Sequence, residues 1–321
     1  MKLLNGINVR RMNRSDAPFL SALFSEVYGR KISSSYFEWR FFKNPLKKNW
    51  AFVAESKDKI KGLATLTPLP IFFEGEKLIV GVSGASMVHP SIQRRGIYTK
   101  LANHMYDVAY DEGCEFICGF PNNNSHYGRI KKLGWFDIYE IPNFSKTTDL
   151  SCIEKSTDGE LTLITKSDLQ KINYNWEIEK KVSESLLCLS QEILFLDWRF
   201  NHPLHKYYIF RCKNFEGEVL IKYFIKEEDQ KEIDILLINS KNKKELLKLI
   251  QCLISFSAAN NIFKINMWLN HSSNNYQLFE SLGFKHESPI TWFSGKQIKG
   301  TNSIFSHYKN WDICFAMSDI Y

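Results

Sequence analysis

Residues 88 to 101 read Val88-His89-Pro90-Ser91-Ile92-Gln93-Arg94-Arg95-Gly96-Ile97-Tyr98-Thr99-Lys100-Leu101. An apolar, β-like run over residues 80–88 precedes the turn, and apolar residues at helical spacing follow it. The first backbone N–H groups of a helix have no intrahelical acceptor, so together with the positive end of the helix dipole they suit a diphosphate. Gly96 places no Cβ in the way, and Arg94 and Arg95 add charged donors. The stretch therefore predicts an anion-binding turn at a helix start.

The next segment repeats the alternation of strand, turn and helix. Residues 113–120 predict a buried strand, residues 121–125 an Asn-rich turn, and residues 127–135 a short helix that ends at Gly134. The predicted order is strand, anion turn, helix, strand, Asn-rich turn, helix, and then a Leu-Gly-aromatic triplet.

This order resembles the second half of the fold of the GCN5-related N-acetyltransferases (GNAT). The hexapeptide from Gln93 resembles that family's pattern Gln/Arg-x-x-Gly-x-Gly/Ala, although Tyr98 replaces the last small residue. The spacing from Asn123 to Trp135 is similar as well. The resemblance implies an α/β (α+β) fold, with a mixed, mostly antiparallel central sheet flanked by helices. It also implies acetyl-CoA, or another acyl-CoA, as cofactor.

The resemblance implies which residues contact the cofactor. Its pantetheine arm would run beside the main chain that leads into the turn, its diphosphate would sit on the turn, and the Asn-rich turn would touch the arm. An Asn-rich turn also commonly caps the helix that follows it. The predicted cofactor-binding residues are Met87, Val88, Gln93, Arg94, Arg95, Gly96, Ile97, Tyr98, Asn123 and Ser125.

The family reaction is direct attack of an amine on the thioester, with a tyrosine as general acid four residues before the glycine of the Leu-Gly-aromatic triplet. Here that position is Ile130. Tyr127 lies one helical turn earlier, and His126 is adjacent, with an imidazole of a type suited to proton transfer. Tyr127 and His126 are therefore the predicted catalytic residues. A counterpart of Tyr127 later in the chain, Tyr276, favours a packing role for it instead.

The general base of the family, a glutamate on the strand before the turn, is missing from residues 82–88. Ser83 or Ser86 would hold a water chain that removes the proton, or Glu38 or Glu74 would approach from elsewhere. The sequence leaves these alternatives open.

A sequence repeat indicates duplication. Glu38-Trp39-Arg40-Phe41 recurs as Asp197-Trp198-Arg199-Phe200, and each quartet precedes Pro-Leu-x-Lys. Residues 127–135 match residues 276–284 at a shift of 149. We expect two tandem GNAT-like folds, over residues 1–150 and 151–321, with the Trp-Arg pairs as core packing. We also expect a closing strand over residues 311–317.

The same shift aligns the anion turn with residues 242–245. Gly96 then falls on Glu245, which adds a Cβ and a negative charge where a diphosphate would lie. The second copy is thus predicted to be degenerate, without a phosphate loop, and the one acyl-CoA site is predicted in residues 1–150.

Composition excludes several classes of protein. The 321 residues are 44% hydrophobic and 24% charged, as in ordinary globular proteins. The net charge of +7 is spread along the chain without a basic, aromatic run, so nucleic acid is not expected as a partner. The longest apolar tract, residues 246–259, is too short to span a bilayer, and no signal peptide is recognised, so a cytoplasmic protein is expected. Seven scattered cysteines predict neither disulfides nor a metal site.

The sequence thus predicts an acetyl-CoA-dependent N-acetyltransferase acting on a small-molecule amine, of unknown oligomeric state. An aromatic content of 14% is compatible with an amino sugar as acceptor. One alternative is an aminoacyl transferase resembling the Fem enzymes, although their coiled-coil insertion has no heptad run here to match it. Another is a non-catalytic module that binds acyl-CoA or a partner.

Overall fold

Two runs of strands and helices follow each other along the chain, which we call the first half (residues 1–150) and the second half (residues 151–321). A computed structural model describes residues 2–4, 6–149, 158–179, 186–213, 216–226, 229–298 and 303–318. The predicted boundary at residue 150 lies outside the described residues.

In the first half, the described helical segments are η1 (Arg14–Asp16), α1 (Ala17–Tyr28), α2 (Ser34–Phe42), η2 (Pro90–Ile92), α3 (Ile97–Asp111) and α4 (Asn123–Leu133). Its strands are β1 (Lys2–Leu4), β2 (Ile7–Arg11), β3 (Trp50–Ser56), β4 (Lys59–Phe73), β5 (Glu76–Ser83), β6 (Met87–Val88), β7 (Phe116–Gly119) and β8 (Phe136–Thr147).

In the second half, the described helical segments are α5 (Lys166–Glu179), α6 (Ile193–Phe200), α7 (Lys243–Ala259), α8 (Tyr276–Ser281), η4 (Ser303–Ser306), η5 (Tyr308–Asn310) and η6 (Phe315–Met317). Its strands are β9 (Gly159–Leu163), β10 (Cys188–Leu189), β11 (Tyr208–Cys212), β12 (Glu218–Ile225), β13 (Lys231–Asn239), β14 (Ile262–Met267) and β15 (Lys285–Gln297).

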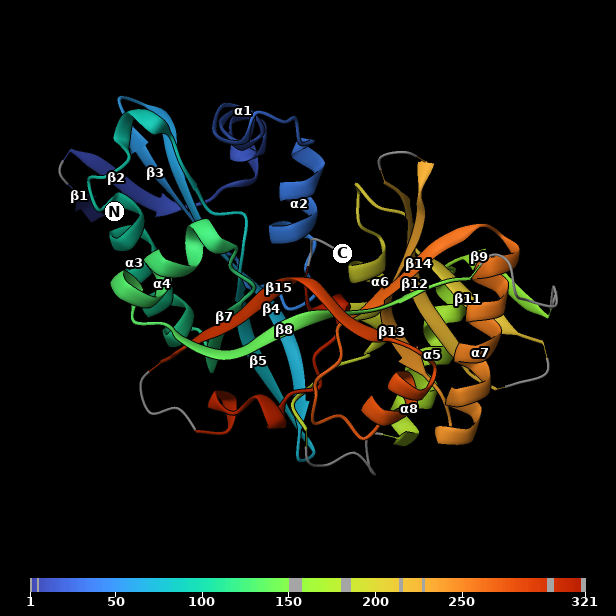
Figure 1. Ribbon diagram of the computed structural model, residues 1–321. Coiled ribbons are helices and arrows are strands. Elements are labelled where there is room, and N and C mark those ends of the chain that lie inside the picture. Colours follow the sequence, from blue (N-terminus) through green and yellow to red (C-terminus); the bar gives the residue numbers. More distant parts are fainter. Residues whose placement is uncertain are drawn as a thin grey trace.

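The strands form one sheet that passes through both halves. Its order is β1-β2-β3-β4-β5-β7-β15-β8-β14-β13-β12-β11-β9, while β6 and β10 pair with β4. Only β5 with β7 and β13 with β14 run parallel among the described pairs. The predicted α/β class, with a mixed and mostly antiparallel sheet flanked by helices, is confirmed (Figure 1).

Strands β8 and β15 lie side by side at the centre and join the two halves. Strand β15, from the second half, pairs with β7, and β8, from the first half, pairs with β14. Figure 1 shows both strands crossing the middle of the molecule. Each half of the sheet is therefore completed by a strand from the other half. The division into two tandem folds stays a prediction.

The repeated tryptophans meet between helices α2 and α6. The Trp39 and Trp198 rings stack at 4.7 Å and 10°. Each indole N–H donates to the other residue's carbonyl, at 2.8 and 2.9 Å. Arg40 and Arg199 are fully buried beside them. These residues contribute to packing, as expected, and such reciprocal contacts are what a duplicated fold would produce.

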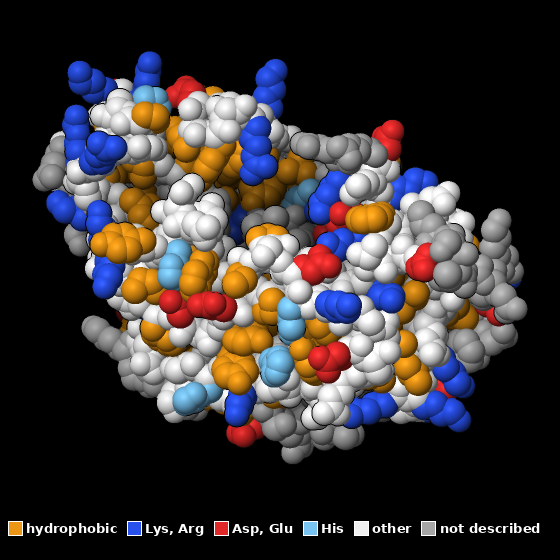
Figure 2. All heavy atoms as spheres, in the orientation of Figure 1, with side chains coloured by type: hydrophobic (Ala, Val, Ile, Leu, Met, Phe, Trp, Pro, Cys, Tyr) orange, Lys and Arg blue, Asp and Glu red, His pale blue; other side chains and the backbone are white. Residues whose placement is uncertain are grey.

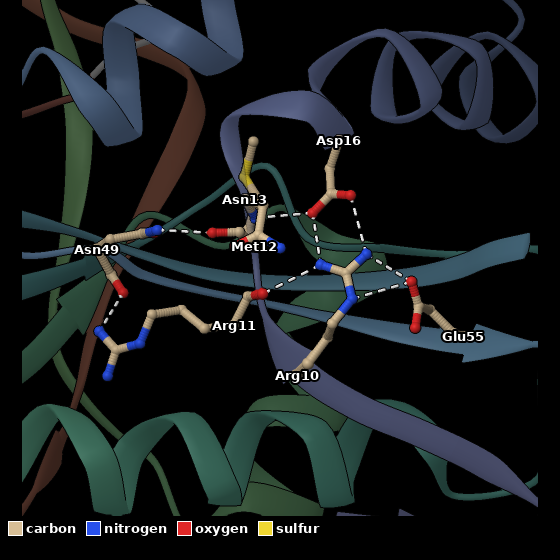
Figure 3. Close-up of polar contacts among 7 residues, drawn as sticks. All are labelled: Arg10, Arg11, Met12, Asn13, Asp16, Asn49 and Glu55. Atoms are coloured by element: carbon tan, nitrogen blue, oxygen red, sulfur yellow. Dashed lines mark hydrogen bonds and ion pairs between the residues drawn. The ribbon is translucent and has the colours of Figure 1, made fainter. Parts of the chain in front are cut away.

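An ion-pair network fixes helix α1 to the sheet. Arg10, on β2, binds Asp16 at 2.6 Å and Glu55, on β3, at 2.5 Å (Figure 3). Burial acts to raise the pKa of Asp16, but the hydrogen bonds and charge of Arg10 outweigh it and hold that pKa below its ordinary value. Helix α1 begins at this carboxylate, so the network holds the start of the helix against the sheet.

Two expected strands differ from the structure. Residues 311–317 do not form a closing strand, because they make a single bridge from Trp311 to Leu187 and then the short helix η6. The apolar run over residues 80–88 is two strands rather than one, since the chain bends at residues 84–86 between β5 and β6. Ala85 there has a φ of 45°, which a regular strand does not allow.

Candidate functional site

Strands β5 and β7 diverge at the centre of the first half. Their parallel pairing ends at Ser83 and Gly119. Beyond it, β6 pairs with β4, while the chain after β7 turns into α4. His89 N–H donates to the Lys61 carbonyl (2.8 Å), so strand alternation turns the N–H and C=O of Val88 away from β4. Among the described residues, β6 has no strand on that other edge, which leaves backbone groups for an extended ligand.

The predicted anion turn follows β6. Gln93 donates its side-chain amide to the Val88 carbonyl (2.8 Å), so it holds the turn against the strand. Arg94 has a φ of 62°, and Arg94 and Arg95 are exposed. Gly96 has a φ of 71°, and no atom lies within 4 Å of an ideal Cβ placed on it. Glycine is therefore required here by backbone conformation, and the space beside it is open.

Helix α3 begins without a side-chain cap. Gly96 offers none, and the Lys100 N–H makes the first intrahelical bond, to the Gly96 carbonyl at 3.1 Å. The N–H groups of Ile97, Tyr98 and Thr99 thus have no intrahelical acceptor. Over its 15 residues, α3 adds the positive end of a helix dipole. These residues fit a diphosphate, because free N–H groups and two arginines surround an open turn.

Helix α7 of the second half begins three residues earlier than the constant shift predicts. Its N-cap is Asn242, so Asn242 rather than Glu245 corresponds to Gly96. The Asn242 side chain accepts from the Lys244 and Glu245 N–H groups, both at 3.0 Å. Glu245 therefore does not stand at the position of Gly96, and the prediction that this glutamate removes the phosphate loop from the second half is wrong. Two of the N–H groups that would bind an anion are already used by the cap.

His126 forms a polar cluster with two strands. Its Nε2 lies 2.7 Å from Asp137 Oδ1, on β8, and Ser294 Oγ, on β15, donates to the same oxygen at 2.7 Å. The imidazole stacks on Trp292 at 4.2 Å and 14°. Ser294 pairs with Gly119 and with Asp137, so the cluster lies in the sheet row where β5 and β7 diverge. Two of its side chains come from the second half.

The other catalytic candidates lie differently. Tyr127 is 67% exposed, and among the described residues it joins no polar cluster like that of His126. Ile130 packs against the core beside α3. Tyr276, the counterpart of Tyr127, lies 2.6 Å from His286 Nε2.

The Asn-rich turn caps α4. Asn122 is the N-cap, and its Oδ1 accepts from the Ser125 N–H at 3.1 Å. Ser125 Oγ lies within 3.0 Å of the same oxygen, while Asn123 Oδ1 accepts from the Trp292 indole at 3.2 Å. The contact of Asn123 and Ser125 with a cofactor stays a prediction.

The candidates for the general base lie at different distances from the divergence of β5 and β7. Glu74 lies in the turn before β5, eight residues of strand away from Ser83, or about 25 Å, so it is excluded from the site. Ser83 Oγ is buried without a partner among the described residues, and Ser86 Oγ donates to Gly84 O at 3.2 Å. Glu26, on α1, was not predicted, and its carboxylate lies 3.0 Å from His89 Nε2, beside β6.

The surface is hollowed in the middle of the molecule, below α1 and α2 (Figure 2). Nearby, a groove of about 360 Å³ between α2 and α6 is lined by Trp39, Lys43, Asp197 and Trp198. Within the described residues, no group of three or more His, Cys, Asp or Glu side chains is arranged to hold a metal ion. No described helix is long and apolar enough to cross a membrane.

Solved structures share this fold over both halves. A GCN5-related N-acetyltransferase from Kribbella flavida is 12% identical with a TM-score of 0.66, over 94% of this chain and 73% of that one. Another from Anabaena variabilis is 12% identical with a TM-score of 0.66, over 90% and 72%. The N-myristoyltransferase of Saccharomyces cerevisiae, with bound myristoyl-CoA, is 11% identical with a TM-score of 0.63, over 94% and 81%.

The sequence itself also matches a known family. No curated protein matches the chain. Residues 8–136, however, match the family model described as an acetyltransferase (GNAT) domain. The first half thus contains a match to the acetyltransferase (GNAT) domain family, on a fold that the chain shares with solved N-acetyltransferases.

Proposed function

We propose that this chain transfers an acetyl group, or another short acyl group, from acyl-CoA to the amine of a small molecule. The observation that carries the proposal is the uncapped start of α3 beside the unpaired edge of β6. The three N–H groups, Arg94 and Arg95 would hold the diphosphate. The outward N–H of Val88, whose carbonyl already accepts from Gln93, would hold the pantetheine arm as a strand holds a neighbour.

The bound acyl-CoA supplies the thioester that the amine attacks. In the reaction a C–N bond forms, the C–S bond breaks, the amine loses a proton and the thiolate gains one. The residues at the divergence would place the amine and polarise the carbonyl through a backbone N–H. Helix α1 brings Glu26 to this edge, and its carboxylate is a candidate to accept the amine's proton, directly or through water.

His126 is the better candidate for the general acid. Asp137 and the Trp292 ring fix its orientation, whereas Tyr127 is largely exposed. A carboxylate that binds one imidazole nitrogen also selects which nitrogen carries the proton. Since Trp292 and Ser294 belong to β15, the second half would contribute to the site directly.

The test combines binding with turnover. Acetyl-CoA should raise the melting temperature of the protein, because a ligand that binds the native state stabilises it by about 2.7 kcal/mol at 100 times its Kd. Release of free CoA should then be measured with a panel of amines that includes nucleotide-linked amino sugars. Acetyl-CoA and myristoyl-CoA should be compared as donors, and a preference for the long chain would contradict a short acyl group.

The alternatives predict other outcomes. A non-catalytic module would bind acyl-CoA but release no CoA with any amine of the panel. A Fem-like enzyme would use aminoacyl-tRNA and leave acyl-CoA unbound. The longest described helix is α7, with 17 residues, so the described residues hold no long coiled coil. If acetyl-CoA at millimolar concentration shifted nothing, the proposed function would be wrong.

A further inference from the structure

Arg129, on α4, is a buried cation that the proposed reaction does not use. The residue is only 7% exposed. Its Nε and Nη1 have no hydrogen-bond partner among the described residues. The guanidinium lies over the Trp135 ring at 4.7 Å, a cation–π contact that leaves the N–H donors free. Because burying a charge without partners is costly, such an arrangement indicates a missing anion.

The guanidinium is linked to α3 through the Trp135 ring on which it packs. The Trp135 indole donates to the Tyr106 hydroxyl, on α3, at 3.2 Å. Burial raises the pKa of Tyr106 and of Tyr28, Tyr98 raises both further, and the charge of Arg129 opposes the rise in each. Arg129 is therefore within electrostatic reach of both hydroxyl groups.

Two of these tyrosines mark the ends of the predicted cofactor path. Tyr98 is in the first turn of α3, above the N–H groups proposed for the diphosphate. Tyr28 donates to the Ser86 carbonyl (2.8 Å), just before β6. Arg129 is thus within electrostatic reach of the Tyr28 end of that path, and Tyr98 acts on the same two hydroxyl groups as Arg129.

The second half offers a comparison. At the shift of 149, Leu278 takes the place of Arg129 and Phe284 that of Trp135. The helix ends support this alignment, because Gly134 and Gly283 follow them with φ values of 68° and 84°. Leu278 packs against the core of its half. A leucine therefore suffices to hold the helix, and the guanidinium occurs only in the half whose α3 start is uncapped.

We propose that Arg129 binds an oxyanion of the acyl-CoA within the space between α3 and α4. Two sources have this chemistry, the diphosphate of the cofactor and a terminal carboxylate on the acyl group. The inference rests on the proposed function, since it requires acyl-CoA in this site. It adds a binding residue that touches the cofactor from α4, opposite the turn.

The test uses Arg129→Leu, which copies the second half, and Arg129→Lys, which keeps the charge. Calorimetry should measure binding of CoA and of pantetheine, which lacks the diphosphate. If the anion is the diphosphate, we expect Arg129→Leu to weaken CoA about 30-fold, as for loss of charged hydrogen bonds, and to leave pantetheine unchanged. Arg129→Lys should recover part of the affinity. The control is Lys131→Leu, which removes an exposed charge from the same helix. It should change CoA affinity by less than about threefold, because solvent and salt screen a surface charge.

The melting temperature without ligand separates binding from packing. Removing an unpaired buried cation should leave it unchanged or raise it. A lower melting temperature with unchanged affinity for both CoA and succinyl-CoA would make Arg129 a structural residue and overturn the proposal. So would an equal loss of CoA and pantetheine binding.

Succinyl-CoA distinguishes the two sources. A loss that is larger for succinyl-CoA than for acetyl-CoA assigns the oxyanion to the acyl carboxylate, and an equal loss assigns it to the diphosphate. If instead the proposed function is wrong, the unmodified protein will bind no CoA at all, which distinguishes that outcome from a failure of the Arg129 proposal alone.

Discussion

Helices α3 and α7 each connect the two parallel strands of their half, β5 with β7 and β13 with β14, but they begin differently. At α3 a long turn with a left-handed glycine leaves three N–H groups without an acceptor. At α7 the chain passes from β13 to the helix within three residues, and Asn242 binds two of the N–H groups. The same kind of helix start is thus open in one half and closed in the other. Whether a helix start binds an anion depends on what already occupies its N–H groups.

The ends of the two parallel strand pairs also differ, being open in the first half and filled in the second. In the first half, Ser83 and Gly119 end the parallel pairing with small side chains. In the second half, Asp234 and Asn266 end it, and the Asn266 amide binds both Asp234 (3.2 Å) and Glu232 (2.7 Å). A buried polar network therefore occupies the place where the first half has its divergence.

The largest effect is expected from Gly96→Glu. The substitution forces a side chain into a left-handed conformation and places a negative charge on the anion turn, so acetyl-CoA affinity should fall more than about 100-fold. Thermal shift and calorimetry measure it. The matched change in the second half, Glu245→Gly, should create no CoA site, because Asn242 still caps α7. New CoA binding by Glu245→Gly would restore the glutamate as the explanation.

His126→Ala should lower kcat about 100-fold and leave the affinity for acetyl-CoA unchanged, because a general acid acts in the transition state. In the second half, His286→Ala removes an imidazole that also bonds to a neighbour, Tyr276, and should leave kcat unchanged. Steady-state kinetics on both variants and on Tyr127→Phe test the assignment. A large loss with Tyr127→Phe and none with His126→Ala would make Tyr127 the acid.

Asp234, in the second half, should make the stability of the protein depend on pH. Burial raises its pKa to about 7, against the attraction of Lys222 and Lys226, with Glu232 adding to the rise. Between about pH 4 and 7 the native state retains a proton that the unfolded state has released, so stability falls as the pH rises through this window. Relative to Asp234→Asn, the melting temperature of the unmodified protein should drop about 4 °C from pH 5 to pH 8. If the melting temperatures of the two proteins changed equally with pH, the raised pKa of Asp234 would be contradicted.

Asn242→Ala should have the smallest effect and should be confined to stability. Loss of an N-cap costs about 1 kcal/mol, or about 2 °C in a chain of this size. Affinity for acetyl-CoA should be unchanged, since the cap lies in the half without the turn. A change in CoA affinity would show that α7 takes part in the site.

The sequence was sufficient for the elements whose signals are local. The turn, α3 and α4 follow from glycines, caps and apolar spacing within short windows, although α4 begins at Asn123, four residues before the predicted helix, because Asn122 caps it. It did not reveal the position of β15 between β7 and β8, because strand pairing across 140 or more residues leaves no local pattern. The Asp137 and Ser294 partners of His126 depend on that pairing.

The first residue of α7 and the burial of Arg129 also could not be predicted from the sequence. A constant shift ignores that the connection before α7 is shorter than the one before α3. Arg129 is followed closely by Lys131 and Lys132, so the segment has the composition of an exposed basic helix. Only the packing of α4 on Trp135 places one of these cations inside.

The exchange of β8 and β15 has a consequence for synthesis of the protein. A ribosome releases the GNAT half first, and N-terminal domains generally fold as they emerge. Here the free edge of β7 pairs with residues 294–297, so the first half stays incomplete until most of the chain has been made. During that interval an unpaired strand edge is exposed to other chains, and such edges are where association between nascent polypeptides begins.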